Sequence, residues 1–299
     1  MSKHIVITGG TGFIGQALSH RLQNHGHRLT VFSRRSSEDV EQRCGRVRVI
    51  DRLSAIPGLG PIDAVINLAG EGIAEKRWSQ RRKQVLWDSR VELTEELVRQ
   101  LDRCPEGPAI LVSGSAVGFY GDQQSAIVTE DTSPNDEFTH RMCAAWENAA
   151  LRAGPERRVC LARTGLVVGR GGGFLQQMLP VFRMGLGGRL GKGTQYMPWI
   201  HREDMVDALI YLLDSTGLEG PFNLTAPNPV TNAEFTRTLA RVLGRPAVLP
   251  APSPALKLAL GEMSRLLLTG QNAVPERLSE SSYEFHYSHL EPALKEALS

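Results

Sequence analysis

The sequence has few cysteines and little net charge, and each shortage excludes a class of protein. Its four cysteines lie far apart and form no C-x-x-C pair, so we expect neither a disulfide framework nor a zinc site, and we predict no metal. Lys and Arg number 34 against 32 for Asp and Glu. This balance is too even to attract nucleic acid or an anionic membrane through bulk charge.

We expect neither a targeting segment nor a membrane-spanning segment. The first residues, Met1–His4, run directly into Ile5–Ile7 and leave no space for a separate apolar signal region. Three charged residues interrupt the apolar stretch Ala255–Leu268, which therefore predicts an amphipathic helix and not a bilayer span. We expect a soluble cytoplasmic protein with a small-molecule substrate and no nucleic-acid or membrane partner; its oligomeric state is not readable from the sequence.

From residue 4 to about 165, short β-branched runs alternate with longer helical segments. The expected strands are His4–Ile7, Leu29–Phe32, Val47–Ile50, Ala64–Leu68, Ala109–Ser113 and Val159–Ala162. The expected helices include Gly15–Asn24, Arg81–Asp102 and His140–Ala153. Strands separated by helices predict right-handed βαβ crossovers, and hence an α/β fold with a doubly wound parallel sheet of the Rossmann type.

Beyond Arg163 the chain becomes irregular and rich in glycine, which indicates a second domain. We assign residues 1–165 and 202–225 to the Rossmann domain. Residues 166–201 and 226–299 are assigned to a smaller, discontinuous α+β substrate domain.

Three local signals after residue 200 predict further helices and strands. A helix is expected from about Arg202, and Pro221–Leu224 is expected to be one more strand. Thr231 and Glu234 have the spacing of a capping box, which predicts a helix that begins there.

A glycine-rich turn, Thr8–Gly15, follows the first expected strand and opens the first expected helix. Its spacing is G-x-x-G-x-x-G. In this context Gly9 permits the tight turn, Gly12 lets a pyrophosphate approach the backbone, and Gly15 lets the helix pack closely on the strand. Backbone N–H groups at the helix N-terminus then hold the pyrophosphate. The predicted dinucleotide contacts in this turn are Gly9, Thr11, Gly12, Phe13, Ile14 and Gly15.

The end of the second strand indicates which dinucleotide binds. NAD enzymes usually carry Asp or Glu there, to accept a hydrogen bond from the ribose 2′-hydroxyl. Here the strand ends in Ser33-Arg34-Arg35. A guanidinium binds a 2′-phosphate that a carboxylate would repel, so we predict NADP(H) as the cofactor, with contacts from Ser33, Arg34 and Arg35.

With these motifs the chain resembles the extended (atypical) short-chain dehydrogenase/reductase family, which includes sugar-nucleotide epimerases. More narrowly, it is similar to a branch labelled "epimerase family protein", which carries a C-terminal domain of unknown function. The resemblance covers nearly the whole chain. The residues that carry it are Thr8–Gly15, Asn67–Gly70, Ser113–Ser115, Arg163–Gly165, Trp199–His201 and Asp204, and for the branch Gly70-Glu71, Arg77-Trp78, Ser89-Arg90, Trp146-Glu147 and the glycine-rich segment 185–193.

The resemblance also implies roles for residues outside the glycine-rich turn. Further cofactor contacts are implied for Leu68, Ala69, Gly70, Glu71, Arg90, Ser113 and Arg163. Ser115 is implied to polarise a substrate oxygen, a role for which Ser113 competes. Arg90 stands where relatives commonly carry an Asn that faces the active site.

The resemblance fails at the catalytic pair. Relatives use Tyr-x-x-x-Lys, in which Lys lowers the pKa of the proton-transferring Tyr. In this chain Thr139 and Cys143 occupy these positions, and the helix contains no Tyr or Lys. Candidate replacements are Tyr120, Cys143, Glu71 and His201. We expect His201 to cap the following helix instead.

The sequence therefore predicts an NADP(H)-dependent oxidoreductase or epimerase-like enzyme for a small polar metabolite, such as a nucleotide-linked sugar. Its catalytic candidates are Ser115, Tyr120 and Cys143. The alternative is a catalytically degenerate NADP(H)-binding sensor or regulatory module, which loss of the Tyr–Lys pair favours. Side chains that could meet an anionic group are Arg183, Arg189 and Lys192, and those that could line an apolar pocket are Gln195, Met197 and Trp199.

Overall fold

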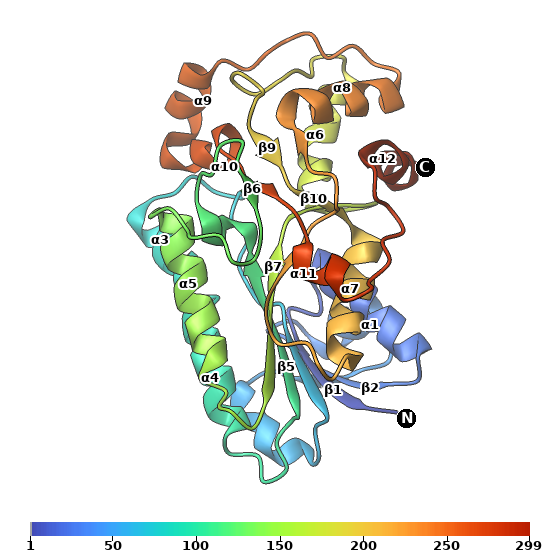
Figure 1. Ribbon diagram of the computed structural model, residues 1–299. Helices are drawn as coiled ribbons and strands as arrows, with labels where there is room; N and C mark the ends of the chain where they lie inside the picture. Colours follow the sequence, from blue (N-terminus) through green and yellow to red (C-terminus); the bar gives the residue numbers. More distant parts are fainter. Residues whose placement is uncertain (1) are drawn as a thin grey trace.

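The computed structural model describes residues 2–299 and is built around one seven-stranded sheet with helices on both faces and a smaller layer above it (Figure 1). All neighbouring strands are parallel, in the order β11-β7-β5-β4-β1-β2-β3. The strands are β1 (His4–Thr8), β2 (Arg28–Phe32), β3 (Arg48–Ile50), β4 (Ala64–Asn67), β5 (Ile110–Ala116), β7 (Arg158–Thr164) and β11 (Gly220–Leu224). The prediction of a doubly wound Rossmann-type sheet is confirmed, and so is the strand expected at Pro221–Leu224.

Two groups of helices cover the sheet, one on each face (Figure 1). They are α1 (Phe13–Asn24), α2 (Ser37–Cys44) and α7 (Arg202–Asp214) on one face, and α3 (Gln80–Asp88), α4 (Val91–Leu101) and α5 (Phe138–Leu151) on the other. The alternation of side chains along β1 supplies both cores: Ile5 and Ile7 pack in one core with Leu18, and Val6 packs in the other with Leu97. Short 3-10 helices occur at Leu53–Leu59, Val117–Tyr120 and Gly261–Ser264.

The single helix predicted for Arg81–Asp102 is wrong, because the chain breaks between α3 and α4. The Ser89 hydroxyl donates to the Leu86 carbonyl at 3.0 Å, and the Arg90 guanidinium donates to the same carbonyl at 3.2 Å. Such side-chain bonds to the last turn compete with helix continuation. The break turns the Arg90 guanidinium back toward the loop after β4, where it donates to the Glu71 carbonyl at 2.8 Å.

The upper layer has an apolar core of its own. Its elements are α6 (Gly173–Arg183), α8 (Asn232–Leu243), α9 (Ser253–Leu260), α10 (Arg265–Leu268), α12 (Leu290–Leu298) and three two-stranded pairs: β8 (Leu166–Val168) with β10 (Trp199–His201), β9 (Tyr196–Met197) with β12 (Val230–Thr231), and β6 (Ile127–Val128) with β13 (Asn272–Ala273). One further helix, α11 (Glu276–Glu280), lies beside β11. Phe182, Trp199 and Phe235 are buried together in this core. The exact division of the chain into two domains stays a prediction.

In the upper layer, the sequence predicted the start of helix α8 correctly but not the end of helix α9. The Thr231 hydroxyl accepts from the Glu234 amide at 3.3 Å, so the predicted cap of α8 is confirmed. The single amphipathic helix predicted for Ala255–Leu268 is wrong, because α9 ends at Leu260 and the next residue, Gly261, has a φ of +60°. Among residues 2–299 we find no helix with the length and apolar content needed to cross a membrane.

Candidate functional site

The glycine-rich turn between β1 and α1 has the geometry of a phosphate site. A Cβ on Gly9 would lie 2.4 Å from the Leu68 carbonyl oxygen, and one on Gly15 would lie 2.2 Å from the Gly9 carbonyl oxygen. Both glycines are therefore required for packing. A Cβ on Gly12 would be 3.2 Å from the Gly9 oxygen and would meet nothing else within 4 Å. Since no side chain caps the N-terminus of α1, its N–H groups face an open cradle that a pyrophosphate fits.

Residues at the end of β2 lie close to this cradle, because β2 is the neighbour of β1. Ser33 is buried and its hydroxyl accepts from the Arg35 amide at 3.1 Å. The Arg34 side chain is 85% exposed and pairs with Glu71 at 3.2 Å. Arg35 pairs with Asp39 at 2.9 Å. Hydrogen bonding from Arg34 lowers the pKa of Glu71, so this side chain is a carboxylate and cannot act as a general acid near neutral pH.

The loop after β4 is held against the glycine-rich turn by a buried polar chain. The Thr8 hydroxyl donates to the Asn67 side chain at 2.6 Å and accepts from the Ala69 amide at 3.2 Å. The Asn67 amide group donates to Thr94 at 2.8 Å and to Ser113 at 3.2 Å. Ser113 is fully buried below the site. A buried hydroxyl cannot reach a bound cofactor, so the structure argues against the cofactor contact that the resemblance implied for Ser113.

At the end of β5, Ser115 belongs to a buried hydrogen-bonded group. Its hydroxyl donates to Glu147 Oε1 at 2.6 Å. The Glu147 carboxylate also accepts hydrogen bonds from Arg163 Nε at 2.8 Å and from Arg163 Nη2 at 2.9 Å. This bidentate ion pair is almost fully buried. Because an ionised carboxylate only accepts hydrogen bonds, the Ser115 hydrogen is directed at Glu147. The Ser115 lone pairs are then available to a hydroxyl group in the adjacent pocket.

The structure argues against catalytic or cofactor contacts by Tyr120 and Arg163. The Tyr120 hydroxyl donates to Asn223 at 2.7 Å and accepts from Arg163 Nη1 at 2.9 Å. Burial raises the pKa of Tyr120 to about 12. Neither side chain is among those that line the pocket described below. Both residues are therefore parts of a buried network that supports Glu147.

Thr139 and Cys143 occupy the face of α5 where relatives carry Tyr and Lys. Both line the pocket, and Glu147 follows one turn later on the same face. Burial, followed by the nearby Glu147 carboxylate, raises the pKa of Cys143 to about 12. The Cys143 thiol is therefore neutral and cannot replace the lysine charge.

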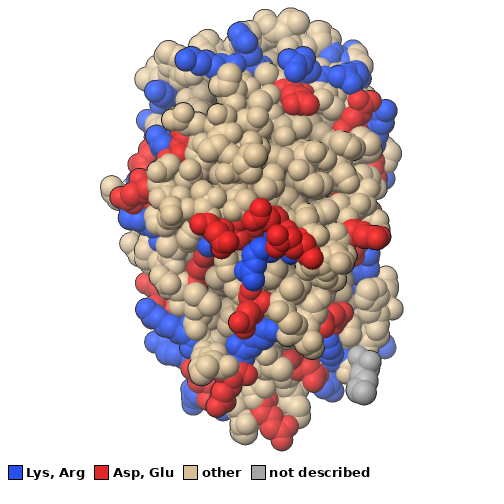
Figure 2. Space-filling model, in the orientation of Figure 1, with Lys and Arg blue, Asp and Glu red and all other residues tan. Residues whose placement is uncertain are grey.

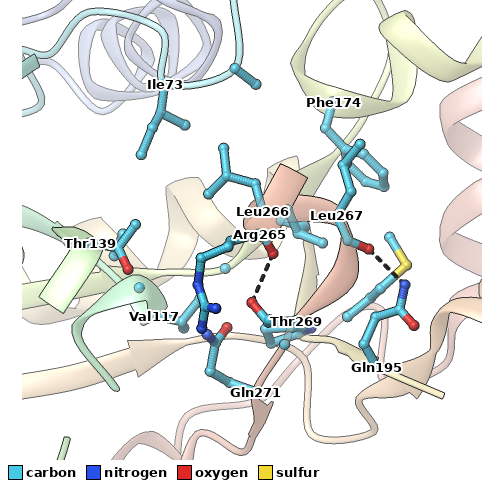
Figure 3. A pocket seen from close by; sticks show the side chains of 18 of the residues that line it. Ile73, Val117, Thr139, Phe174, Gln195, Arg265, Leu266, Leu267, Thr269 and Gln271 are labelled. Atoms are coloured by element: carbon cyan, nitrogen blue, oxygen red, sulfur yellow. Dashed lines mark hydrogen bonds between the residues drawn. The ribbon is translucent and has the colours of Figure 1, made fainter. Parts of the chain in front are cut away.

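A cavity of about 960 Å³ lies between the carboxyl end of the sheet and the upper layer. Ile14, Leu68, Arg90 and Ser115 border it on the sheet side. Figure 3 shows residues 265–271, which we call the roof segment, at the cavity; the Arg265 and Gln271 side chains converge there beside Val117. This size is typical of a pocket for a small molecule.

Several residues named from the sequence lie elsewhere. His201 is buried, and its Nδ1 accepts from the Glu203 amide at 3.3 Å while its Nε2 lies 2.7 Å from Glu296; its capping role is confirmed. Trp199 is fully buried in the upper core. The pocket lining includes Gln195 and Met197 but not the three basic residues Arg183, Arg189 and Lys192. Within residues 2–299, no group of three or more His, Cys, Asp or Glu is placed to hold a metal ion.

Sequence reasoning missed two parts of the site. Glu147 was named only among the residues that carry the resemblance, although its spacing from Thr139 and Cys143 already placed it on the same face. The roof segment carried no signal, because its role depends on contacts with residues far away in the chain.

Comparison with known proteins defines the family. A family model described as the NAD dependent epimerase/dehydratase family matches residues 5–224. The chain belongs to the NAD dependent epimerase/dehydratase family. A second model, described as a domain of unknown function (DUF1731), matches residues 251–297. The resemblance inferred from the motifs is thus confirmed.

Relatives in distant organisms match over their full length. Epimerase family protein YfhF of Bacillus subtilis is 38% identical over 298 residues, which are 99% of this chain and 98% of the relative. Epimerase family protein SDR39U1 of Homo sapiens is 37% identical over 296 residues, 98% of each chain. These matches extend through the upper layer and not only through the sheet.

Solved structures agree with this assignment. The crystal structure of human SDR39U1 (isoform2) with NADPH has a TM-score of 0.90 and 34% identity, and the match covers 98% of each chain. MoeE5 in complex with UDP-glucose and NAD has a TM-score of 0.77 and 22% identity, with 98% of this chain and 97% of the other covered. At that identity the likeness shows the fold alone.

Proposed function

We propose that this protein binds NADP(H) along the carboxyl edge of the sheet. Gly9, Gly12 and the N-terminus of α1 would hold the pyrophosphate, and Arg34 would bind the 2′-phosphate. The open cradle at Gly12 and the absence of a carboxylate at the end of β2 support this cofactor. The human relative that was solved with NADPH supports it independently.

We further propose that the protein is an oxidoreductase that interconverts an alcohol and a carbonyl compound. The observation that carries this proposal is Ser115, whose side chain lines the pocket at the carboxyl end of β5. Bound in the neighbouring groove, the nicotinamide would accept or supply the hydride. We place this activity in the cytoplasm, with no nucleic-acid or membrane partner.

The residues around Ser115 provide a route for the proton in the oxidation direction. An alcohol hydroxyl would donate to the lone pairs of Ser115 Oγ, whose own hydrogen is directed at Glu147, 2.6 Å away. If a hydride passed from the carbinol carbon to bound NADP⁺, the substrate O–H bond would break and its proton would pass to Ser115. The Ser115 proton would then pass to the Glu147 carboxylate, which Arg163 holds in place. Reduction would reverse each transfer, with NADPH as the hydride donor.

A second candidate function is an NADP(H)-binding sensor that performs no reaction. Thr139 and the neutral Cys143 thiol in place of Tyr and Lys favour it. A screen of alcohols with NADP⁺ and of ketones with NADPH separates the two functions, with absorbance of the reduced cofactor as the readout. If NADPH binds but no compound in the screen changes its absorbance, the sensor is supported and the oxidoreductase is not.

Ser115→Ala tests the enzyme directly. Loss of the group that moves the proton should lower kcat by about 100-fold or more. Ser279→Ala is the matched control, because this hydroxyl donates to the carbonyl of Pro275, the residue before α11, and does not line the pocket. Equal activity of the Ser115 and Ser279 variants would remove Ser115 from the reaction.

A further inference from the structure

The walls of the cavity are mainly apolar and come from several separate elements. Val117 and Cys143 lie on the sheet side, Phe174 and Met178 come from α6, and Leu267 comes from the roof segment (Figure 3). Apolar lining continues to the surface, where large side chains on the rim remain exposed: Val181 (44%), Leu186 (51%) and Leu249 (52%). On the face drawn in Figure 2, the band between the charged clusters, level with β9 and α10 in Figure 1, is also mainly uncharged.

The charged side chains that border the cavity are already paired with protein groups. Arg141 lies 2.7 Å from Asp136, and Arg265 binds Glu137 through two nitrogens. Glu262 lies 2.6 Å from Lys83. These pairs leave the lining with no surplus of positive charge.

The third arginine of the lining, Arg90, is occupied in a different way. Its guanidinium donates to the carbonyls of Glu71 and Leu86, and it lies over the Trp146 ring at 5.5 Å. Burial lowers the pKa of Arg90, so its charge is already poorly solvated. A pyrophosphate would have to displace these contacts to reach it.

Three of the uncharged polar side chains in the lining already donate to protein carbonyl groups. The Gln195 side chain donates to the carbonyls of Leu190 and Leu267, and the Gln271 side chain donates to the Gly121 carbonyl at 2.7 Å. The Thr269 hydroxyl donates to the Arg265 carbonyl. Burying a polar ligand without hydrogen-bond partners costs free energy, so this lining disfavours a sugar that carries many hydroxyl groups.

We propose that the substrate is an uncharged, mainly apolar alcohol or ketone, with one oxygen at Ser115 and its apolar body between α6 and the roof segment. This inference rests on the proposed oxidoreductase function and specifies its substrate class. It replaces the nucleotide-linked sugar expected from the family resemblance, because the three basic and three acidic side chains of the described lining leave no surplus positive charge for the two negative charges of a pyrophosphate.

The test is a binding series with straight-chain secondary alcohols, from 2-butanol to 2-decanol, measured by titration calorimetry with and without NADP⁺. Transfer of each added methylene into an apolar site should lower Kd by about fourfold until the cavity is filled. UDP-glucose is the comparison ligand, and it should not compete with 2-decanol. A Kd that does not change with chain length, or UDP-glucose that displaces 2-decanol, would overturn the proposed substrate class.

Two matched variants locate the binding site. Leu267→Asn places a polar group in the roof segment and should weaken 2-decanol binding by about tenfold. Leu258→Asn makes the same change on α9, where Leu258 is 82% exposed and does not line the cavity, and should leave Kd unchanged. Equal effects of the two substitutions would also contradict the proposal.

The series separates this inference from the function on which it rests. Failure to bind NADPH would reject the proposed oxidoreductase, whereas the alcohol series without cofactor still measures the pocket. NADPH binding together with a flat alcohol series would reject the substrate class alone.

Discussion

The guanidinium of Arg34 lies 3.2 Å from the carboxylate of Glu71, and the two residues follow strands on either side of β1. Their contact therefore crosses the groove in which we place the cofactor. Since Arg34 is 85% exposed, the pair contributes little stability. A 2′-phosphate can replace the Glu71 carboxylate as the partner of Arg34 at small cost.

Arg34→Ala should weaken NADPH binding by about tenfold or more and leave NADH binding nearly unchanged. The reason is that a charge-assisted hydrogen bond contributes about 1.5–3 kcal/mol and NADH has no 2′-phosphate. Calorimetric titration with both dinucleotides measures the difference. The companion variant Glu71→Gln removes the competing carboxylate and should strengthen NADPH binding. An equal loss of both dinucleotides in Arg34→Ala would mean that Arg34 does not contact the 2′-phosphate.

Gly12→Val should abolish dinucleotide binding in a protein that still folds. The valine side chain would fill the cradle that the pyrophosphate needs, whereas the protein itself places only the Gly9 oxygen near a Cβ at this position. Gly217→Val is a suitable control, because a Cβ there meets nothing within 4 Å. The readouts are circular dichroism for folding and calorimetry for binding. Unchanged affinity in folded Gly12→Val would contradict the phosphate site.

Glu147→Ala should lower the free energy of unfolding by about 3–5 kcal/mol, because it leaves the buried Arg163 charge unpaired. The double variant Glu147→Ala with Arg163→Met removes both charges and should regain part of this loss. Urea denaturation of wild type, single and double variants measures the coupling. A double variant less stable than the sum of the two single changes would show that the pair does not act in this way.

The free energy of unfolding should fall as the pH rises above about 9. Burial raises the pKa of Cys143 from 9.0 to about 12 and that of Cys160 from 9.0 to about 11. The unfolded chain therefore loses these protons at a lower pH than the folded protein does. Each such thiol makes the free energy of unfolding fall by about 1.4 kcal/mol per pH unit between its unfolded and folded pKa values.

Urea denaturation at pH 8, 9, 10 and 11 tests this dependence. Cys143→Ala should flatten the decline, because alanine has no proton to lose. A wild-type free energy of unfolding that stays constant from pH 9 to 11 would contradict the assignment of buried neutral thiols.

The parts of the fold that the sequence predicted are those governed by local pattern. Apolar runs predicted the strands, and the spacing of Gly9, Gly12 and Gly15 predicted the cradle, because strand, turn and helix are adjacent in the chain. The cap at Thr231 was predicted for the same reason. NADP(H) as the cofactor agrees with the NADPH in the human relative.

The parts that the sequence did not predict depend on contacts between distant residues. The break at Ser89 and Arg90 is stabilised in part by the Glu71 carbonyl, which lies 19 residues before Arg90 in the chain. Tyr120 is a catalytic candidate by sequence, whereas its bonds to Asn223 and Arg163 place it in a buried network. Neither contact leaves a periodic signal in the sequence.

The pairing of β13 with β6 has a consequence for the order in which the protein matures on the ribosome. Asn272–Ala273 pair with Ile127–Val128 and directly follow the roof segment. Because synthesis proceeds from the N-terminus, all seven strands of the large sheet are made before residues 265–273 emerge. The sheet and the glycine-rich turn are therefore complete in the nascent chain before the roof segment that borders the cavity has been made.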